Sequence, residues 1–207
     1  MAPTGHPPRD HPLRARRRQS GLSMTEVLVA VFTFAFGGVG AATMQILAAQ
    51  ANLEAQQRSE AVYQATDMLE RIRNNTDALA DYDTPADGQW TIVGDGSIAS
   101  QPTPDCDSVA CTPQQRVAHD LWAWERALDG HTRTSADATP TGGLHHPTGC
   151  IRNHDIDDPG KIEVAIAWYG RQEMTDSPVA PACTATDRYG EESQFRRVVR
   201  LRTYIQP

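Results

Sequence analysis

The sequence predicts an α+β fold, in which one long N-terminal helix packs on a small antiparallel sheet head with one extra helix and long, disulfide-tied loops. Three observations predict it: an uncharged apolar stretch at 27–49, helical periodicity that continues to about residue 73, and two alternating segments near the C-terminus. A chain of 207 residues has room for one ordinary domain, or for a small domain and an appendage.

The first part of the long helix, residues 22–51, is apolar enough to span a membrane. Its uncharged run would form a helix of roughly 34 Å, which exceeds the hydrocarbon thickness of a bilayer. Five arginines precede this run, whereas the first basic residue after it is Arg58. The positive-inside rule therefore predicts a cytoplasmic N-terminus and an exported C-terminal part.

The same helix is predicted to continue as an amphipathic segment over residues 52–75, so that one helix runs from about Leu22 to Arg73. Charged residues occupy the other faces of this segment. The apolar residues at helical spacing are Leu53, Val62, Ala65, Leu69 and Ile72. The remaining residues, 76–207, are predicted to form a globular head.

Within the head, one further helix and two strands are predicted. Thr112 and Pro113 carry a capping-box start signal, and the periodicity after them ends near Gly130. Residues 161–169 and 196–205 alternate as half-buried antiparallel strands do.

The rest of the head is predicted to be mostly polar loop, at 81–112 and 130–160, with one short strand candidate at 89–93. Four arginines are expected to balance the acidic head or to line the solvent face of an edge strand; they are Arg196, Arg197, Arg200 and Arg202.

All of the cysteines lie in the C-terminal half of the chain, at Cys106, Cys111, Cys150 and Cys183. An even number of cysteines in an exported segment predicts two disulfides. The residues alone permit three pairings.

The start of the apolar stretch carries a motif. Gly21 is followed by Leu22, and Glu26 is the fifth residue after Gly21. A carboxylate inside a membrane span is unfavourable, by up to roughly 3 kcal/mol at mid-bilayer and less near the headgroups, so its presence suggests a function. A basic leader that ends in Gly, with Glu at this distance, resembles the signal of type IV prepilins and pseudopilins.

The resemblance implies that residues 1–21 are a leader, which a prepilin peptidase removes by cutting between Gly21 and Leu22. The same enzyme would N-methylate Leu22, and Glu26 would pair with the new amine of a neighbouring subunit. Partners would be other major and minor pilins. The protein would lie in the inner membrane with a periplasmic head, and then in a pilus at the cell surface. Leu22, where the family commonly has Phe, and Thr25, where it has an apolar residue, depart from the pattern.

The head resembles the PilV-type minor pilins. The residues that carry this likeness are Cys106-x4-Cys111, then Ala118-x-Asp120-Leu121-x-x-Trp124, and later Gly142-Gly143, Cys150 and a strand ending in Trp168. This resemblance implies the pairs Cys106–Cys111 and Cys150–Cys183, and a minor pilin that primes or modifies the filament.

Three other interpretations are consistent with parts of the sequence. A minor pseudopilin of a type II secretion system would share the N-terminal motif. A bitopic periplasmic protein would keep its anchor uncleaved, and an exported module would be released after Ala51.

The net charge of −7 argues against nucleic-acid binding. Since catalytic motifs are absent from the sequence, neither enzyme activity nor a cofactor or metal is predicted. A zinc interpretation of His145, His146, Cys150 and His154 is disfavoured, because Cys150 is expected to be oxidised.

Overall fold

The computed structural model describes most of the chain. The described residues are 21–82, 90–94, 97–98, 100–131, 134–137, 140, 142–153, 160–174 and 186–206. The chain divides into two compact units, Met1–Leu47 and Ala48–Pro207. The boundary between them falls inside the first helix, α1 (Met24–Arg73). The length of α1 confirms the predicted long helix.

The described part of the first unit is the N-terminal portion of α1. Ser23 begins the helix, because its Oγ accepts a hydrogen bond from the backbone N–H of Glu26 at 3.2 Å. All of the side chains from 21 to 47 are exposed. Among the described residues, α1 is the helix that is long and apolar enough to cross a membrane.

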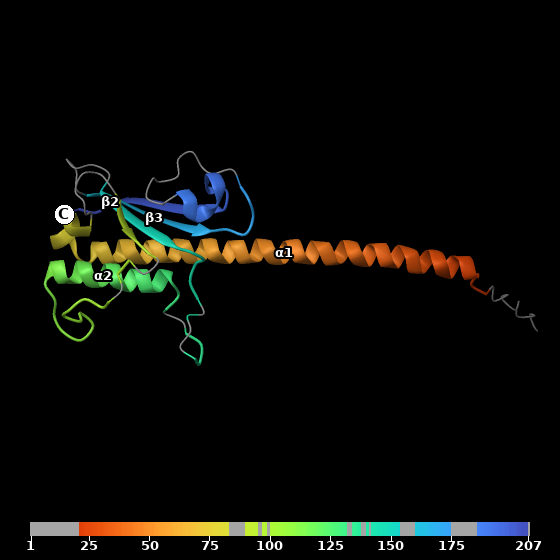
Figure 1. Cartoon of the computed structure of the whole chain (residues 1–207), viewed down its shortest axis with the longest axis horizontal. Coiled ribbons are helices and arrows are strands. Elements are labelled where there is room, and N and C mark those ends of the chain that lie inside the picture. The colour runs from red at the N-terminus through yellow and green to blue at the C-terminus, as the bar shows by residue number, and fades with distance from the viewer. Residues whose placement is uncertain are drawn as a thin grey trace, which may run out of the picture. The chain divides into compact units, whose positions relative to one another are not determined.

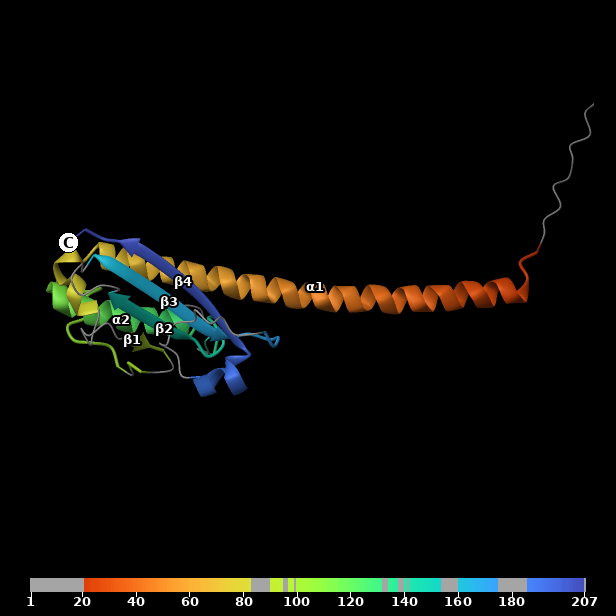
Figure 2. The same cartoon turned by 90° about the horizontal axis from the view of Figure 1, so that it is seen from above.

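The second unit contains the rest of α1 and the elements of the head (Figures 1 and 2). These are η1 (Thr76–Tyr82), β1 (Thr91–Val93), α2 (Pro113–Leu128), β2 (Thr148–Asn153), β3 (Lys161–Tyr169), η2 (Thr186–Tyr189), η3 (Glu191–Ser193) and β4 (Arg196–Tyr204). The strands form one four-stranded sheet in the order β1-β2-β3-β4, with each neighbouring pair antiparallel. The predicted α+β class is therefore confirmed.

One face of the sheet and one side of α1 build the core of the second unit. Val164 pairs with Ile151 on β2 and with Leu201 on β4, so the three side chains share a sheet face. The α1 residues buried in the same core include two alanines; the set is Ala61, Ala65, Met68, Leu69 and Ile72. Small residues let a helix and a sheet approach closely.

The predicted helix α2 has the expected caps. Thr112 and Gln115 form a reciprocal capping box, and Pro113 occupies the first helical position. After the helix, Gly130 adopts a φ of 79°, a left-handed conformation that glycine tolerates best. A Cβ at this position would also overlap the carbonyl of Gly142.

Two expectations about the sheet are wrong. Residues 148–153 form β2, not part of a polar loop, and they pair along their whole length with β3. The segment lacks a clear alternation of its own, so its strand conformation follows from the partner strand. In addition, β3 is buried on both faces, because Glu163, Ala165 and Ala167 are inaccessible as well as the apolar set.

Three elements meet at Trp124. Its side chain is fully buried, and its Nε1–H donates to the backbone carbonyl of Gln64 on α1 at 3.0 Å. On β2, a Cβ added to Gly149 would lie 2.5 Å from Cη2 of the indole. Gly149 therefore leaves the space into which α2 inserts its largest side chain.

We expect Gly149→Ala to lower the free energy of unfolding by about 1–3 kcal/mol, because the added methyl overpacks the indole. Denaturant unfolding of the purified protein measures this cost. In a Trp124→Phe background the same change should cost less, because the clashing ring atoms are gone. Equal costs in the two backgrounds would show that the close contact is not responsible.

Candidate functional site

The predicted processing site lies at the beginning of α1. Gly21 has open space around it, and Leu22 is 76 % exposed. Glu26 follows in the first helical turn and is also exposed. In the part of the chain that the structure describes, its carboxylate forms no ion pair.

The apolar side chains that follow Glu26 are exposed all around the helix. The bulky ones are Val27, Leu28, Val29, Val31, Phe32, Phe34, Phe36, Val39, Met44, Ile46 and Leu47. An uninterrupted apolar surface of this size does not persist in water, and it is suited to lipid or to other apolar helices.

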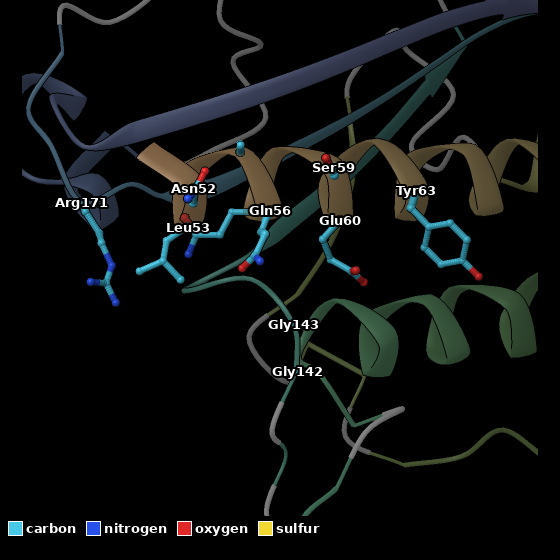
Figure 3. A pocket seen from close by; sticks show the side chains of 11 residues that line it. Asn52, Leu53, Gln56, Ser59, Glu60, Tyr63, Gly142, Gly143 and Arg171 are labelled. Atoms are coloured by element: carbon cyan, nitrogen blue, oxygen red, sulfur yellow. The ribbon is translucent and has the colours of Figure 1, made fainter. Parts of the chain in front are cut away.

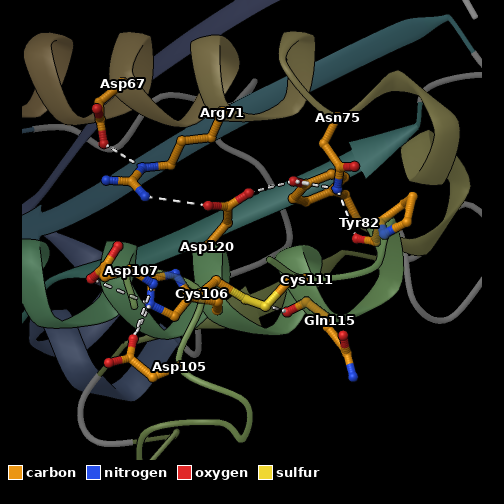
Figure 4. Close-up of polar contacts among 12 residues, drawn as sticks. Asp67, Arg71, Asn75, Tyr82, Asp105, Cys106, Asp107, Cys111, Gln115 and Asp120 are labelled. Carbon is orange, nitrogen blue, oxygen red and sulfur yellow. Dashed lines mark hydrogen bonds and ion pairs between the residues drawn. A yellow bond between two sulfur atoms is a disulfide. The ribbon is translucent and has the colours of Figure 1, made fainter. Parts of the chain in front are cut away.

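At the other end of α1, a buried polar network joins the helix to η1 and α2 (Figure 4). Asp120 accepts a hydrogen bond of 2.6 Å from the Tyr82 hydroxyl and contacts Nη1 of Arg71 at 3.3 Å. Asn75 Nδ2 donates to the Tyr82 hydroxyl and to the backbone carbonyl of Pro113. Burial raises the pKa of Tyr82, and the bond to Asp120 raises it further. The phenol therefore stays a neutral donor.

A disulfide lies directly before α2. Cys106 and Cys111 are bonded, with their Cα atoms 5.5 Å apart. This is the pairing that the PilV-type resemblance implies. Cys150 is buried and also takes part in a disulfide. Cys183 lies outside the described residues, so the pair Cys150–Cys183 stays a prediction.

The family model described as Type IV pilin Tt1218 matches residues 43–122. This match supports a relation of the chain to the type IV pilin-like superfamily. The matched segment covers the C-terminal part of α1, the Tyr82–Asp120 network, the disulfide and the first part of α2. It does not include Gly21, Leu22 or Glu26, so the N-terminal motif is a separate observation. No curated protein and no solved structure matches the chain.

The pilin family is structural, and a pilin-like role includes association with other pilins. The apolar N-terminal helix of this pilin-like chain is consistent with a membrane-anchored pilin.

A groove of about 1160 Å³ lies between α1 and the loops of the head (Figure 3). Its described lining is mostly polar, and Tyr63, Glu60 and Arg171 supply its largest polar groups. Glu60 accepts a hydrogen bond from Nε2 of Gln64, so its carboxylate has a structural role. No histidine or cysteine is among the described lining residues, and the groove offers Ser59 no evident base.

A buried carboxylate on β3 organises the outer face of the sheet. Glu163 is fully buried and lies directly across from Arg152 on β2 and Arg202 on β4. Its oxygens contact Arg152 at 2.9 Å and Arg202 at 3.3 Å, and Arg200 contacts it as well. Burial by itself raises the pKa of Glu163, but Arg152 and Arg200 more than offset this, so the pKa is lower than usual.

The sequence predicts that Arg200 and Arg202 balance the acidic head or line the solvent face of an edge strand, and it does not single out Glu163. In the structure both arginines contact Glu163. Both arginines occupy the polar positions of an alternating strand, and Glu163 occupies such a position in β3. The register between the strands, which the sequence does not reveal, makes them neighbours.

A second carboxylate fixes a loop. Glu125 on α2 is buried and accepts hydrogen bonds from the backbone N–H groups of Gly94, Ser97 and Ile98 at 2.6–2.9 Å. It thus ties the segment after β1 to the helix and satisfies donors that the sheet leaves unpaired.

We expect Glu163→Gln to lower the free energy of unfolding at pH 7 by about 3 kcal/mol, the lower part of the range for a broken buried pair, since the arginines are partly exposed. A lowered folded-state pKa stabilises the fold above the ordinary value of 4.5, and the stabilisation is lost as pH falls through the folded pKa. The difference between wild type and variant should therefore shrink in acid.

Thermal unfolding across pH 3–7 measures this difference. The control is Glu173→Gln, which changes an exposed carboxylate and should shift stability by less than about 0.5 kcal/mol. A wild-type advantage that stayed constant down to pH 3 would contradict the assigned ionisation of Glu163.

Proposed function

We propose that this chain is a minor pilin of a type IV pilus, of the PilV type, made as a precursor whose leader is removed by a prepilin peptidase. The observation that carries the proposal is the combination of Gly21-Leu22 and Glu26 with an exposed apolar helix, followed by a segment, residues 43–122, that matches a pilin family.

The positions of the motif suit a peptidase reaction. Gly21 lacks a side chain, so its backbone can enter a narrow active site, and the bond after it precedes the first turn of α1. Hydrolysis of the Gly21–Leu22 peptide bond leaves a carboxylate on Gly21 and an α-amine on Leu22. The peptidase would then methylate that amine.

The charge of the Glu26 carboxylate would favour ordered assembly of the filament. A carboxylate in an apolar medium is costly alone and favourable only with a cation. The Leu22 amine of a neighbouring subunit would be that cation, so the charge pair favours a filament in register over a single inserted helix. Processing thus creates the group that assembly requires.

The closest alternative is a minor pseudopilin of a type II secretion system, which would use the same N-terminal chemistry. The bonded Cys106–Cys111 pair before a Trp-bearing helix supports the PilV-type assignment. Gene neighbours that encode pilus assembly components, rather than secretion components, would favour the pilus. A bitopic protein with an uncleaved anchor differs in the N-terminus of its mature form.

We expect the mature protein, extracted from membranes that contain a prepilin peptidase, to begin at N-methyl-Leu22. Intact-mass and N-terminal peptide mass spectrometry test this. Gly21→Asp should leave the leader attached, because the larger charged residue does not fit the peptidase, whereas Thr25→Val should be processed normally. A start at Met1 would indicate an ordinary anchor, and a start at Asn52 a released module.

We expect Glu26→Gln to be processed normally but to enter filaments at least about tenfold less than wild type, a loss of roughly 1.4 kcal/mol per subunit. Sheared filaments, quantified by immunoblot against the membrane pool, give the ratio. Thr25→Val is the matched control, because it changes the neighbouring position without touching the charge. Equal incorporation of Glu26→Gln and wild type would remove the assembly role of Glu26.

A further inference from the structure

Three side chains with metal-binding atoms converge beside the first disulfide. Asp105 and Asp107 flank Cys106, and His119 projects from α2. Nε2 of His119 lies 3.6 Å from Oδ1 of Asp105 and 3.5 Å from Oδ2 of Asp107. The three ligand atoms all lie within 4.8 Å of one another. Figure 4 shows the two aspartates next to the Cys106–Cys111 bond.

The imidazole is the unusual member of this cluster. The His119 side chain is only 3 % exposed, and its buried Nε2 has no hydrogen-bond partner. Buried polar atoms in folded proteins nearly always have a partner, and leaving one unmade is costly. Nε2 nevertheless points at two carboxylates, at distances too long for a hydrogen bond.

These distances fit ligands of one small cation. Two ligand atoms bound to the same tetrahedral Zn²⁺, each at about 2.1 Å, lie roughly 3.4 Å apart. The separations of 3.5 and 3.6 Å are close to this value. A direct ion pair would instead draw the atoms to about 2.8 Å.

We propose that Asp105, Asp107 and His119 form a binding site for a divalent transition-metal ion, Zn²⁺ above all. Imidazole with two carboxylates suits Zn²⁺ or its neighbours, whereas Ca²⁺ and Mg²⁺ take oxygen ligands almost alone. Water would complete the tetrahedron.

The fold prepares the site from two directions. The capping box at Thr112 starts α2 and so fixes the helix that carries His119. The disulfide joins Cys106, which lies between the two aspartates, to Cys111 directly before α2, and the backbone N–H of Asp107 donates to Oδ1 of Asp105 at 3.1 Å. Asp107 is 79 % exposed and leaves a path for the ion. A bound ion would fasten the disulfide loop to α2 and stabilise the head by linkage.

The site is independent of the proposed processing, because none of its residues belongs to the N-terminal segment. The test uses the full-length protein in detergent, stripped with EDTA and freed of the chelator. Titration with Zn²⁺ against a competing chromogenic chelator gives the affinity, and thermal unfolding reports the linked stability. We expect a single Zn²⁺ to bind, to raise the melting temperature, and to be outcompeted poorly by Ca²⁺ or Mg²⁺.

Two variants test the ligands. His119→Gln and Asp107→Asn should each weaken Zn²⁺ binding by about tenfold or more, since even the loss of an outer-shell partner costs that much. Because Asp107 is exposed, its variant should keep the wild-type circular dichroism even where the change at the buried His119 disturbs folding. His145→Gln, an exposed histidine of the same unit, is the matched control and should bind like wild type.

Replacement of Zn²⁺ by Co²⁺ adds a spectroscopic readout, because a tetrahedral site with a nitrogen ligand gives visible d–d absorption. That absorption should disappear in Asp107→Asn. The proposal is overturned if the stripped protein binds no Zn²⁺, or if both ligand variants bind Zn²⁺ as tightly as wild type. It is also overturned if His145→Gln, rather than the ligand variants, weakens Zn²⁺ binding.

Discussion

The structure of the head depends on burying one side of α1. The helix presents a row of small and flexible residues, including Ala61, Ala65 and Met68, to the sheet and to α2. Because two of these are alanines, the neighbouring elements approach the helix backbone closely enough for Trp124 to donate to a carbonyl of α1. The indole ring occupies the space next to Gly149, and this contact positions β2 relative to α1 and α2.

Polar groups at the edges of this core fix the relative positions of elements that apolar packing alone does not determine. Asp120 and Tyr82 hold the end of α1 against α2 and η1, and Glu125 holds the loop after β1. On the outer face of the sheet, Glu163 joins three strands through arginines. Each of these carboxylates is buried and each is satisfied by donors, which is the condition under which such groups stabilise a fold. These carboxylates also favour one arrangement of the elements, which a small apolar core alone would specify only weakly.

The difference between the N-terminal part of α1 and the head is consistent with a pilin-like protein. The N-terminal part of α1 carries an apolar surface that only lipid or other helices can cover, while the head satisfies its own polar groups and closes its loops with disulfide bonds. The head can therefore keep its structure whatever covers the apolar part of the helix.

Local patterns of residues are enough to predict the elements whose signals lie within one segment. The apolar run, the periodicity of α1, the capping box of α2 and the alternation of β3 and β4 all predict structure from neighbouring residues, and Gly21 and Glu26 form a motif within six positions. Helix and strand periods are read directly from such patterns, so the α+β class and most element bounds followed.

Contacts between residues far apart in the chain depend instead on how the elements pack together. β2 has little pattern of its own and is a strand because β3 pairs with it. Glu163 meets its arginines through strand register, and His119 on α2 meets Asp105 and Asp107, which flank the disulfide-bonded Cys106. These arrangements depend on which elements pack together, and packing is set by the free energy of the whole core rather than by any local segment.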